Sequence, residues 1–193
     1  MKKFELVEEQ KINWCDRTLF RIKACIDFVT ASGCEIHAGD LGGYVEKEDN
    51  LSQCRKAWVY GDAKVYGYAF VHGNAEICGN AEVFGSAEVD GNAFGCNNAF
   101  IYGDSKVGGN ALVCGNAEIH EDAWVFGNAM IKENAKVYGN AEICNDTYIF
   151  GNAKVCGDAK VYGDAKVYDN AKVCGHAKVC GDADICGDTE VYD

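Results

Sequence analysis

Hydrophobic and polar positions follow one another along most of the chain with a period of six residues. From Val59 to Val191 an aliphatic residue returns at every sixth position, with Gly95 as the one exception and without insertion or deletion. Four residues after each aliphatic residue stands a small one, which is Ala in all but three units. A fixed short period is the signature of a repeat architecture. The pattern therefore predicts a solenoid domain over residues 59–193.

Each unit has the pattern of a short strand followed by a turn. In a four-residue strand, the Ala and the aliphatic residue point to one side and the two variable residues to the other. The turn pair is usually Gly-Asn or Gly-Asp, as at Gly79-Asn80, and these residue types tolerate the positive φ of a sharp corner. Three units make one triangular coil, so we expect residues eighteen apart to stack in parallel ladders. The chain has no proline, which fits ladders that use every backbone N–H.

This pattern resembles that of the hexapeptide-repeat family, whose units carry an aliphatic residue first and a small residue at the fifth place. The resemblance covers residues 59–190, which form twenty-two consecutive units. It implies an all-β fold, a left-handed parallel β-helix of about seven coils. At about 4.8 Å per coil the solenoid is expected to be roughly 35 Å long. The chain departs from the family in preferring Gly at the third place of the unit to Gly at the second.

Residues 1–58 do not repeat, and we expect them to form a small N-terminal β cap. Segments 4–7 and 18–25 have the composition of short strands. Residues 39–44, Gly-Asp-Leu-Gly-Gly-Tyr, resemble the start of YdcK-like hexapeptide proteins of bacteria, phages and prophages, where such a motif precedes the solenoid. A cap protects the open edge of the first coil, which would otherwise template aggregation.

Composition and charge narrow the class of protein. The formal net charge is −12 and the isoelectric point is near 4.7, which argues against a direct nucleic-acid or anionic-membrane binder, since both need a basic surface. The first residues show no apolar signal-peptide core, and no long apolar run occurs. We therefore expect a cytoplasmic protein without a membrane span, a metal or a cofactor.

The cysteines share a pattern of their own. Nine of the twelve, from Cys54 to Cys186, occupy the same outward place in the six-residue period. Eight of them stand directly after an aliphatic position of the repeat, and Cys54 precedes the repeat in the same register. Cys78, Cys96 and Cys114 are expected to form one column, and Cys156 and Cys174 another. Stacked Cα atoms about 4.8 Å apart lie within disulfide range, but parallel in-register pairs rarely direct their side chains suitably. We expect all of these thiols to be reduced surface residues.

Sorting the outward positions at eighteen-residue intervals reveals an apolar strip on the face that carries Val59 and Ile77. The strip consists of Phe94, Leu112, Met130, Tyr148 and Phe150, with Cys96 and Cys114 beside them. It is larger than a monomer normally leaves in water. Three interpretations stay open: an interface between copies of this chain, a surface covered by the cap, or a groove for a foreign protein.

The solenoid also carries most of the negative charge. Residues 59–193 hold 9 basic and 20 acidic residues, a net charge of −11. The densest acidic patch is an edge formed by Glu82, Asp104, Glu118, Glu121 and Asp122. Spread over the solenoid, this is about one charge per 3 Å, against about one per 1.7 Å for duplex DNA. The edge could imitate DNA in part, or it could simply keep the rod soluble.

Hexapeptide acyltransferases, to which the repeat is similar, use a histidine as general base. His120 is the candidate here, because Glu118, Glu121 and Asp122 are close enough in sequence to orient an imidazole. Against this function, no loop leaves the repeat, and no basic cluster is present for the phosphates of coenzyme A. A solvated surface histidine is the simpler interpretation.

The sequence therefore favours a rigid, non-enzymatic binding protein that forms homo-oligomers. The resemblance to phage-associated proteins implies an inhibitor of a host protein, such as a nucleic-acid-targeting defence effector. We expect that partner to bind through the apolar strip, the acidic edge, or both. Two alternatives remain: an acyltransferase that uses an acyl-coenzyme A, and a structural scaffold that assembles into a longer rod.

Overall fold

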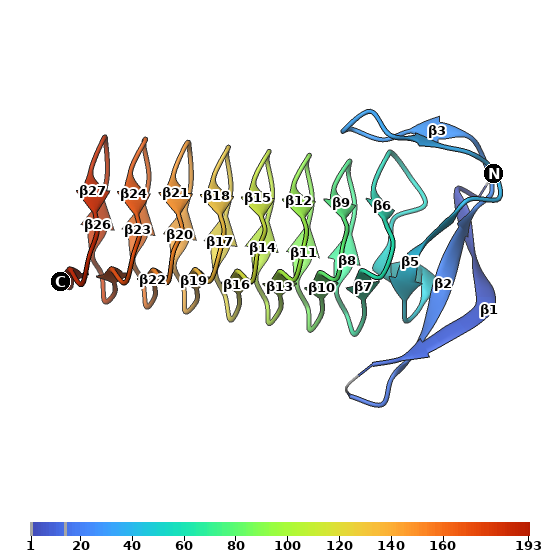
Figure 1. The fold of residues 1–193 in the computed structure, drawn as a ribbon, viewed down its shortest axis with the longest axis horizontal. Helices are drawn as coiled ribbons and strands as arrows, with labels where there is room; N and C mark the ends of the chain where they lie inside the picture. Colours follow the sequence, from blue (N-terminus) through green and yellow to red (C-terminus); the bar gives the residue numbers. More distant parts are fainter. Residues whose placement is uncertain (1, 14) are drawn as a thin grey trace.

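In the computed structural model, which describes residues 2–13 and 15–193, the chain forms a parallel β-solenoid closed at one end by a cap (Figure 1). The architecture fits a left-handed parallel β-helix of about eight turns, so the predicted fold class is confirmed. Across the described residues there is no helix of the length and apolarity that crossing a membrane requires.

Three sheets run along the solenoid, and we call them faces A, B and C. Face A contains β7 (Lys64–Val65), β10 (Glu82–Val83), β13 (Phe100–Ile101), β16 (Glu118–Ile119), β19 (Lys136–Val137), β22 (Lys154–Val155), β25 (Lys172–Val173) and β28 (Glu190–Val191). Face B contains β8 (Phe70–Val71), β11 (Glu88–Val89), β14 (Lys106–Val107), β17 (Trp124–Val125), β20 (Glu142–Ile143), β23 (Lys160–Val161) and β26 (Lys178–Val179). Face C contains β6 (Trp58–Val59), β9 (Glu76–Ile77), β12 (Phe94–Gly95), β15 (Leu112–Val113), β18 (Met130–Ile131), β21 (Tyr148–Ile149), β24 (Lys166–Val167) and β27 (Asp184–Ile185).

The ladders pair residues eighteen apart, as the period predicts. Glu82 lies opposite Phe100, for example, and Val83 opposite Ile101. The inward Ala and aliphatic side chains of successive coils are buried in one continuous core. Gly95 breaks the aliphatic series without leaving a gap, because a Cβ there would already lie 3.1 Å from Ile77 Cδ1. A larger neighbour thus fills the space that the missing side chain leaves.

The corners stack as closely as the strands. Gly79 has a φ of +68°, and a Cβ at this position would lie 2.9 Å from the backbone N of Asn97 in the next coil. The turn residue after it belongs to an amide ladder, in which Asn80 Nδ2 donates to Asn98 Oδ1 at 3.1 Å. The same bond recurs from coil to coil along this corner. Backbone sterics and side-chain amides therefore hold the coils in one register.

The cap is a small sheet that joins face A at its first strand. In this sheet β1 (Phe4–Ile12), β2 (Thr18–Ala24) and β5 (Leu41–Val45) lie side by side. The cap also contains a separate two-stranded sheet, β3 (Phe28–Val29) with β4 (Glu35–Ile36), and the 3₁₀ turn η1 (Glu48–Asn50). β1 includes the predicted strand segment 4–7, and β2 covers the predicted segment 18–25 except for its last residue. β5 pairs antiparallel with β2 and parallel with β7, with Val45 opposite Val65. The winding of the solenoid therefore begins before the hexapeptide repeat does.

Two glycines of the cap motif stand where no side chain fits. A Cβ on Gly42 would lie 2.6 Å from Ile22 Cγ1, and one on Gly43 would lie 2.6 Å from Val59 Cγ1. The Gly-Gly pair lets β5 lie tightly between the cap sheet and the first coil. This contact gives a physical reason for the motif.

One cysteine prediction is wrong. Cys156 and Cys174 form a disulfide between neighbouring coils of face A, with their Cα atoms 4.7 Å apart. The coil spacing alone brings the two residues within bonding range, and their side chains do face each other. Cys78, Cys96 and Cys114 are free thiols, as expected.

Candidate functional site

Five rings stack in one column along face A, which we call the aromatic column. It consists of Tyr66, Phe84, Tyr102, His120 and Tyr138, each placed directly after the aliphatic residue of its coil. Neighbouring ring centroids are 4.8–5.0 Å apart, and the interplanar angles are 1–10°. The distance between coils thus sets the distance between the stacked rings. Because each ring covers the faces of its neighbours, the column presents ring edges at its surface.

The cap fixes the first ring of the column. Tyr66 is buried in a small cluster with Leu19 and Tyr44, and Phe84 packs against this cluster. Cations cover Tyr44 in turn: Lys11 Nζ lies 5.2 Å and Arg21 Cζ 5.4 Å from its ring centroid. The aromatic column is therefore anchored at one end and continues rigidly along the solenoid.

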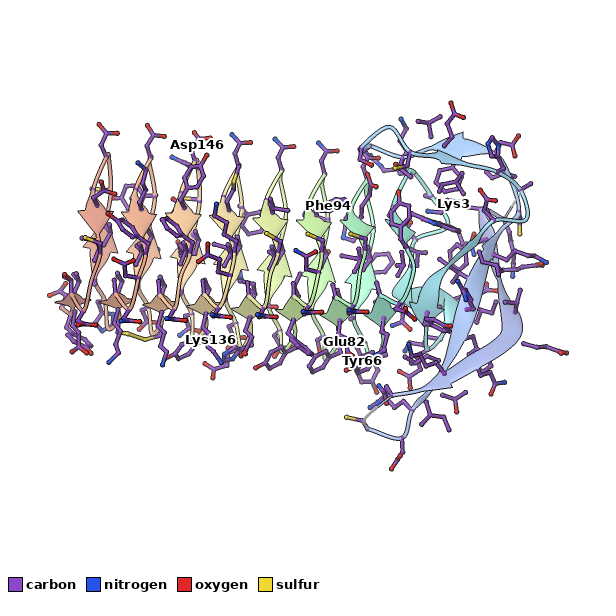
Figure 2. All side chains as sticks on the ribbon, viewed as in Figure 1. Lys3, Tyr66, Glu82, Phe94, Lys136 and Asp146 are labelled. Atoms are coloured by element: carbon purple, nitrogen blue, oxygen red, sulfur yellow. A yellow bond between two sulfur atoms is a disulfide. The ribbon has the colours of Figure 1, made fainter. Side chains whose placement is uncertain are left out.

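A row of charged residues runs beside the aromatic column. Lys64 Nζ donates to Glu82 Oε1 at 2.5 Å, and Tyr66 Oη donates to Glu82 Oε2 at 2.8 Å. Glu82 is only 6% exposed, so it supports the column instead of joining an exposed acidic edge. Figure 2 shows Tyr66 and Glu82 together near the cap, with Lys136 farther along the same side of the solenoid.

Phe100 interrupts this row of charges and opens a hollow. It lies between Glu82 and Glu118 in the ladder, and its ring meets Phe84 edge to face at 6.4 Å. Phe84, Phe100, Tyr102 and Glu118 line a shallow depression of about 330 Å³. Ring edges and one carboxylate thus meet in a concave apolar patch at the centre of face A.

The corner between faces A and B places carboxylates on the other side of the aromatic column. Asp104, Glu121 and Asp122 are exposed there. Glu121 has a φ of +58°, and its Oε2 accepts the backbone N–H of Gly139 at 2.8 Å. Glu118 forms an ion pair with Lys136 at 2.8 Å. The acidic edge predicted from the sequence therefore borders the aromatic column, but Glu82 does not contribute to its surface.

His120 is the fourth ring of the column. Its ring lies 4.9 Å from that of Tyr102 and 5.0 Å from that of Tyr138. Burial lowers the pKa of His120, and this effect outweighs the opposite one of Glu121, whose Oε1 lies 3.7 Å from Nδ1. The imidazole therefore stays neutral to a lower pH than a free histidine, and both of its ring faces are covered. Only its edge could meet a substrate.

Comparison with protein-family models and with curated proteins finds no match. The case for a function therefore rests on the surfaces themselves.

The apolar strip lies on face C, where the ladder pairs Phe94 with Leu112, Leu112 with Met130 and Met130 with Tyr148. These side chains are half-buried, as is Phe150 in the neighbouring column. Figure 2 shows Phe94 on the side of the solenoid away from Tyr66 and Lys136.

The cap covers the part of face C that precedes the strip. Phe28 packs edge to face on Trp58, with ring centroids 5.4 Å apart. The backbone N–H and the hydroxyl of Ser32 donate to the Glu76 carboxylate at 2.7 and 2.8 Å. Phe94 follows Glu76 in the ladder. The strip thus starts one coil beyond these contacts, which favours an interface with another molecule.

The thiol column beside the strip is not suited to nucleophilic chemistry. Burial, together with the neighbouring Cys114 and Cys78, raises the pKa of Cys96 to about 12. Burial also raises the pKa of Cys78 and of Cys114. Because the thiolate is the reactive form, these raised pKa values make the three cysteines less reactive than a free thiol at neutral pH.

Sequence reasoning missed the aromatic column. The signal was available, because the five rings stand eighteen residues apart in the printed sequence. A search for an apolar face passes over it, because Lys or Glu stands two residues before four of the five rings. Sorting the outward positions by the presence of a ring, and not by hydrophobicity, would have revealed the column.

Proposed function

We propose that this chain is a rigid, non-enzymatic binding protein that engages a protein partner through face A. The observation that carries the proposal is the aromatic column with its central hollow at Phe100, bordered by exposed carboxylates. Aromatic residues are enriched at protein interfaces, and central aromatic anchors supply much of the binding energy. The column offers such anchors on a backbone that the coil ladders hold in place.

The orientation of the rings supports a protein as the partner. Sugars and single-stranded nucleic acids stack on exposed ring faces, whereas neighbours cover the ring faces within this column. The net charge of −12 also repels nucleic acid. Ring edges with hydroxyl groups suit the mixed apolar and polar contacts of a protein surface.

The charge indicates what kind of protein surface would fit. Asp104 and Asp122 border the aromatic column and are exposed, so the complementary surface is basic around an apolar centre. A nucleic-acid-targeting effector of a host cell has a basic surface, because it binds phosphates. We therefore propose a phage-encoded, cytoplasmic inhibitor of an effector of this class, in keeping with the resemblance of the cap motif.

We also propose that the apolar strip of face C joins copies of this chain. The strip and the aromatic column lie on different faces, so a dimer formed through face C leaves face A free. Each copy would then present its own aromatic column to a partner.

The experiment that tests the proposal is site-specific photo-crosslinking in host cells. Benzoylphenylalanine replaces Phe100 on face A or, as a matched control, the exposed Tyr162 on face B. We expect one basic host protein to be crosslinked from position 100 and not from position 162. Equal crosslinking from both positions would remove face A as the binding surface.

A thermal-shift assay with acetyl-coenzyme A tests the acyltransferase alternative. Stabilisation of the protein by acetyl-coenzyme A in a thermal-shift assay, abolished in His120→Ala, would contradict a non-enzymatic function. We expect no such stabilisation, because both faces of the His120 ring are covered.

A further inference from the structure

A glycine on face B makes room for two side chains to meet. Gly108 stands directly after Val107, in a position that carries an outward side chain in the neighbouring coils. A Cβ there would lie 2.2 Å from Asp90 Oδ1 and 2.7 Å from Phe126 Cε1. Asp90 and Phe126 come from the coils on either side and cover Gly108 between them. The glycine is required for this approach.

The result is a notch with aromatic and acidic walls. Glu88, Asp90, Lys106, Trp124 and Phe126 line a depression of about 260 Å³. The Trp124 and Phe126 rings meet edge to face, with centroids 5.8 Å apart at 71°. Trp124 is 48% exposed, so much of its indole is open to a ligand.

The chain itself places a cation in this environment. Lys106 Nζ lies 5.6 Å from the Trp124 ring centroid and 3.5 Å from Glu88 Oε2. Glu88 also accepts a contact from His72 Nε2 at 2.8 Å. Within the described part of the chain, the Asp90 side chain has neither a hydrogen bond nor an ion pair. One carboxylate of the notch is thus paired, and the other is left to a ligand.

We propose that this notch binds an organic cation, an alkylated ammonium or a guanidinium group. The ring faces attract the cation through their quadrupole, and the two aromatic rings favour alkylated ammonium over strongly hydrated inorganic ions. Asp90, which lines the notch, supplies the counter-charge. The site lies on face B and is independent of the partner surface proposed for face A.

The cation is carried either by a small free molecule or by a side chain of a protein. Choline is the probe for the first source. N-acetyl-trimethyllysine amide and N-acetyl-arginine amide are the probes for the second. Binding of choline at lower concentration than either amide assigns a small metabolite, and the reverse order assigns a peptide side chain.

The test is an NMR titration that follows the indole N–H of Trp124 and the amide of Gly108. Choline is compared with 3,3-dimethylbutan-1-ol, its uncharged analogue of the same shape. We expect saturable shifts of both signals with at least one cationic probe, and binding of the uncharged alcohol at least about tenfold weaker than that of choline. Equal affinity for choline and the alcohol, or the absence of saturation with every cationic probe, would overturn the proposal.

Three variants locate the site. Asp90→Asn keeps the shape of the notch and is expected to weaken binding about tenfold. Lys106→Met removes the competing cation but keeps an apolar stem, so binding should become tighter. Asp184→Asn, the same change at an exposed residue of face C, should leave affinity unchanged. If Asp90→Asn and Asp184→Asn bind equally well, the notch is not the site.

Discussion

Replacing Glu82 by glutamine tests how much the buried carboxylate beside the aromatic column contributes to the stability of the fold. Glu82→Gln keeps the size of the side chain and removes its charge. The Lys64 side chain is only 17% exposed, so its ammonium would then lack a counter-charge in a largely buried place. Removing one partner of a fully buried pair costs about 3–5 kcal/mol. Because Lys64 retains some contact with water, we expect a loss of about 2–3 kcal/mol.

A matched control is present in the same row of the same face. Glu118 pairs with Lys136 at 2.8 Å, but the two side chains are 29% and 39% exposed. Ion pairs exposed to this degree contribute about 0–1 kcal/mol. Glu118→Gln therefore makes the same chemical change with little expected effect. Both variants break a Lys–Glu ion pair, and the sites differ in burial and in the Tyr66 hydroxyl, which donates to Glu82.

Thermal unfolding followed by circular dichroism measures both effects. For a chain of 193 residues, about 1 kcal/mol corresponds to about 2–4 °C. Glu82→Gln should lower the midpoint by about 4–12 °C, and Glu118→Gln by less than about 4 °C. A double variant, Lys64→Met with Glu82→Met, should recover much of the loss because no buried charge remains. Equal shifts for the two single variants would refute the reasoning.

Three further predictions concern the other faces and the middle of the column. Met130→Glu places a charge in the apolar strip and should reduce the mass measured by light scattering to that of a monomer; an unchanged oligomer would remove the strip from the interface. Burial lowers the pKa of His120 from its ordinary 6.5, so the unfolded chain takes up this proton first as the pH falls. Wild type should therefore lose more thermal stability below about pH 6.5 than His120→Phe, which keeps the stack; parallel pH profiles would contradict this. Peptide mapping without reductant should link Cys156 to Cys174, and Cys174→Ser should cost about 3 kcal/mol; two free thiols at these positions would show that the pair is not bonded.

The period of the sequence predicted the arrangement of the coils down to individual pairs. Leu112 lies opposite Met130 because an uninterrupted six-residue repeat leaves the ladder one register. Inward and outward positions follow from the same period. The members of each column of outward side chains could thus be deduced from the sequence. This includes the aromatic column, which a search by hydrophobicity overlooked.

Burial of individual charges could not be predicted in this way. Glu82 and Glu118 occupy equivalent positions on face A, yet only Glu82 is covered, because Lys64 and Tyr66 fold onto it. Glu76 is buried because Ser32 of the cap reaches it from 44 residues away. Such differences depend on side-chain directions and on the course of the cap. A repeat pattern does not contain this information.

The notch at Gly108 could not be predicted from the sequence pattern either. The sequence shows a glycine in an outward position, but not that Asp90 and Phe126 lean over it from adjacent coils. Its chemistry arises from the distance between side chains of different coils, which only a three-dimensional structure provides.

The central claim is that face A is the surface that binds a partner. The most direct test is the dissociation constant for the protein crosslinked at position 100, measured by titration calorimetry with purified components. Loss of a central aromatic anchor costs about 2 kcal/mol, so Phe100→Ala should raise the dissociation constant about thirtyfold. Tyr162→Ala, which removes an exposed ring from face B, should leave it unchanged. Equal dissociation constants for wild type and Phe100→Ala would contradict the account.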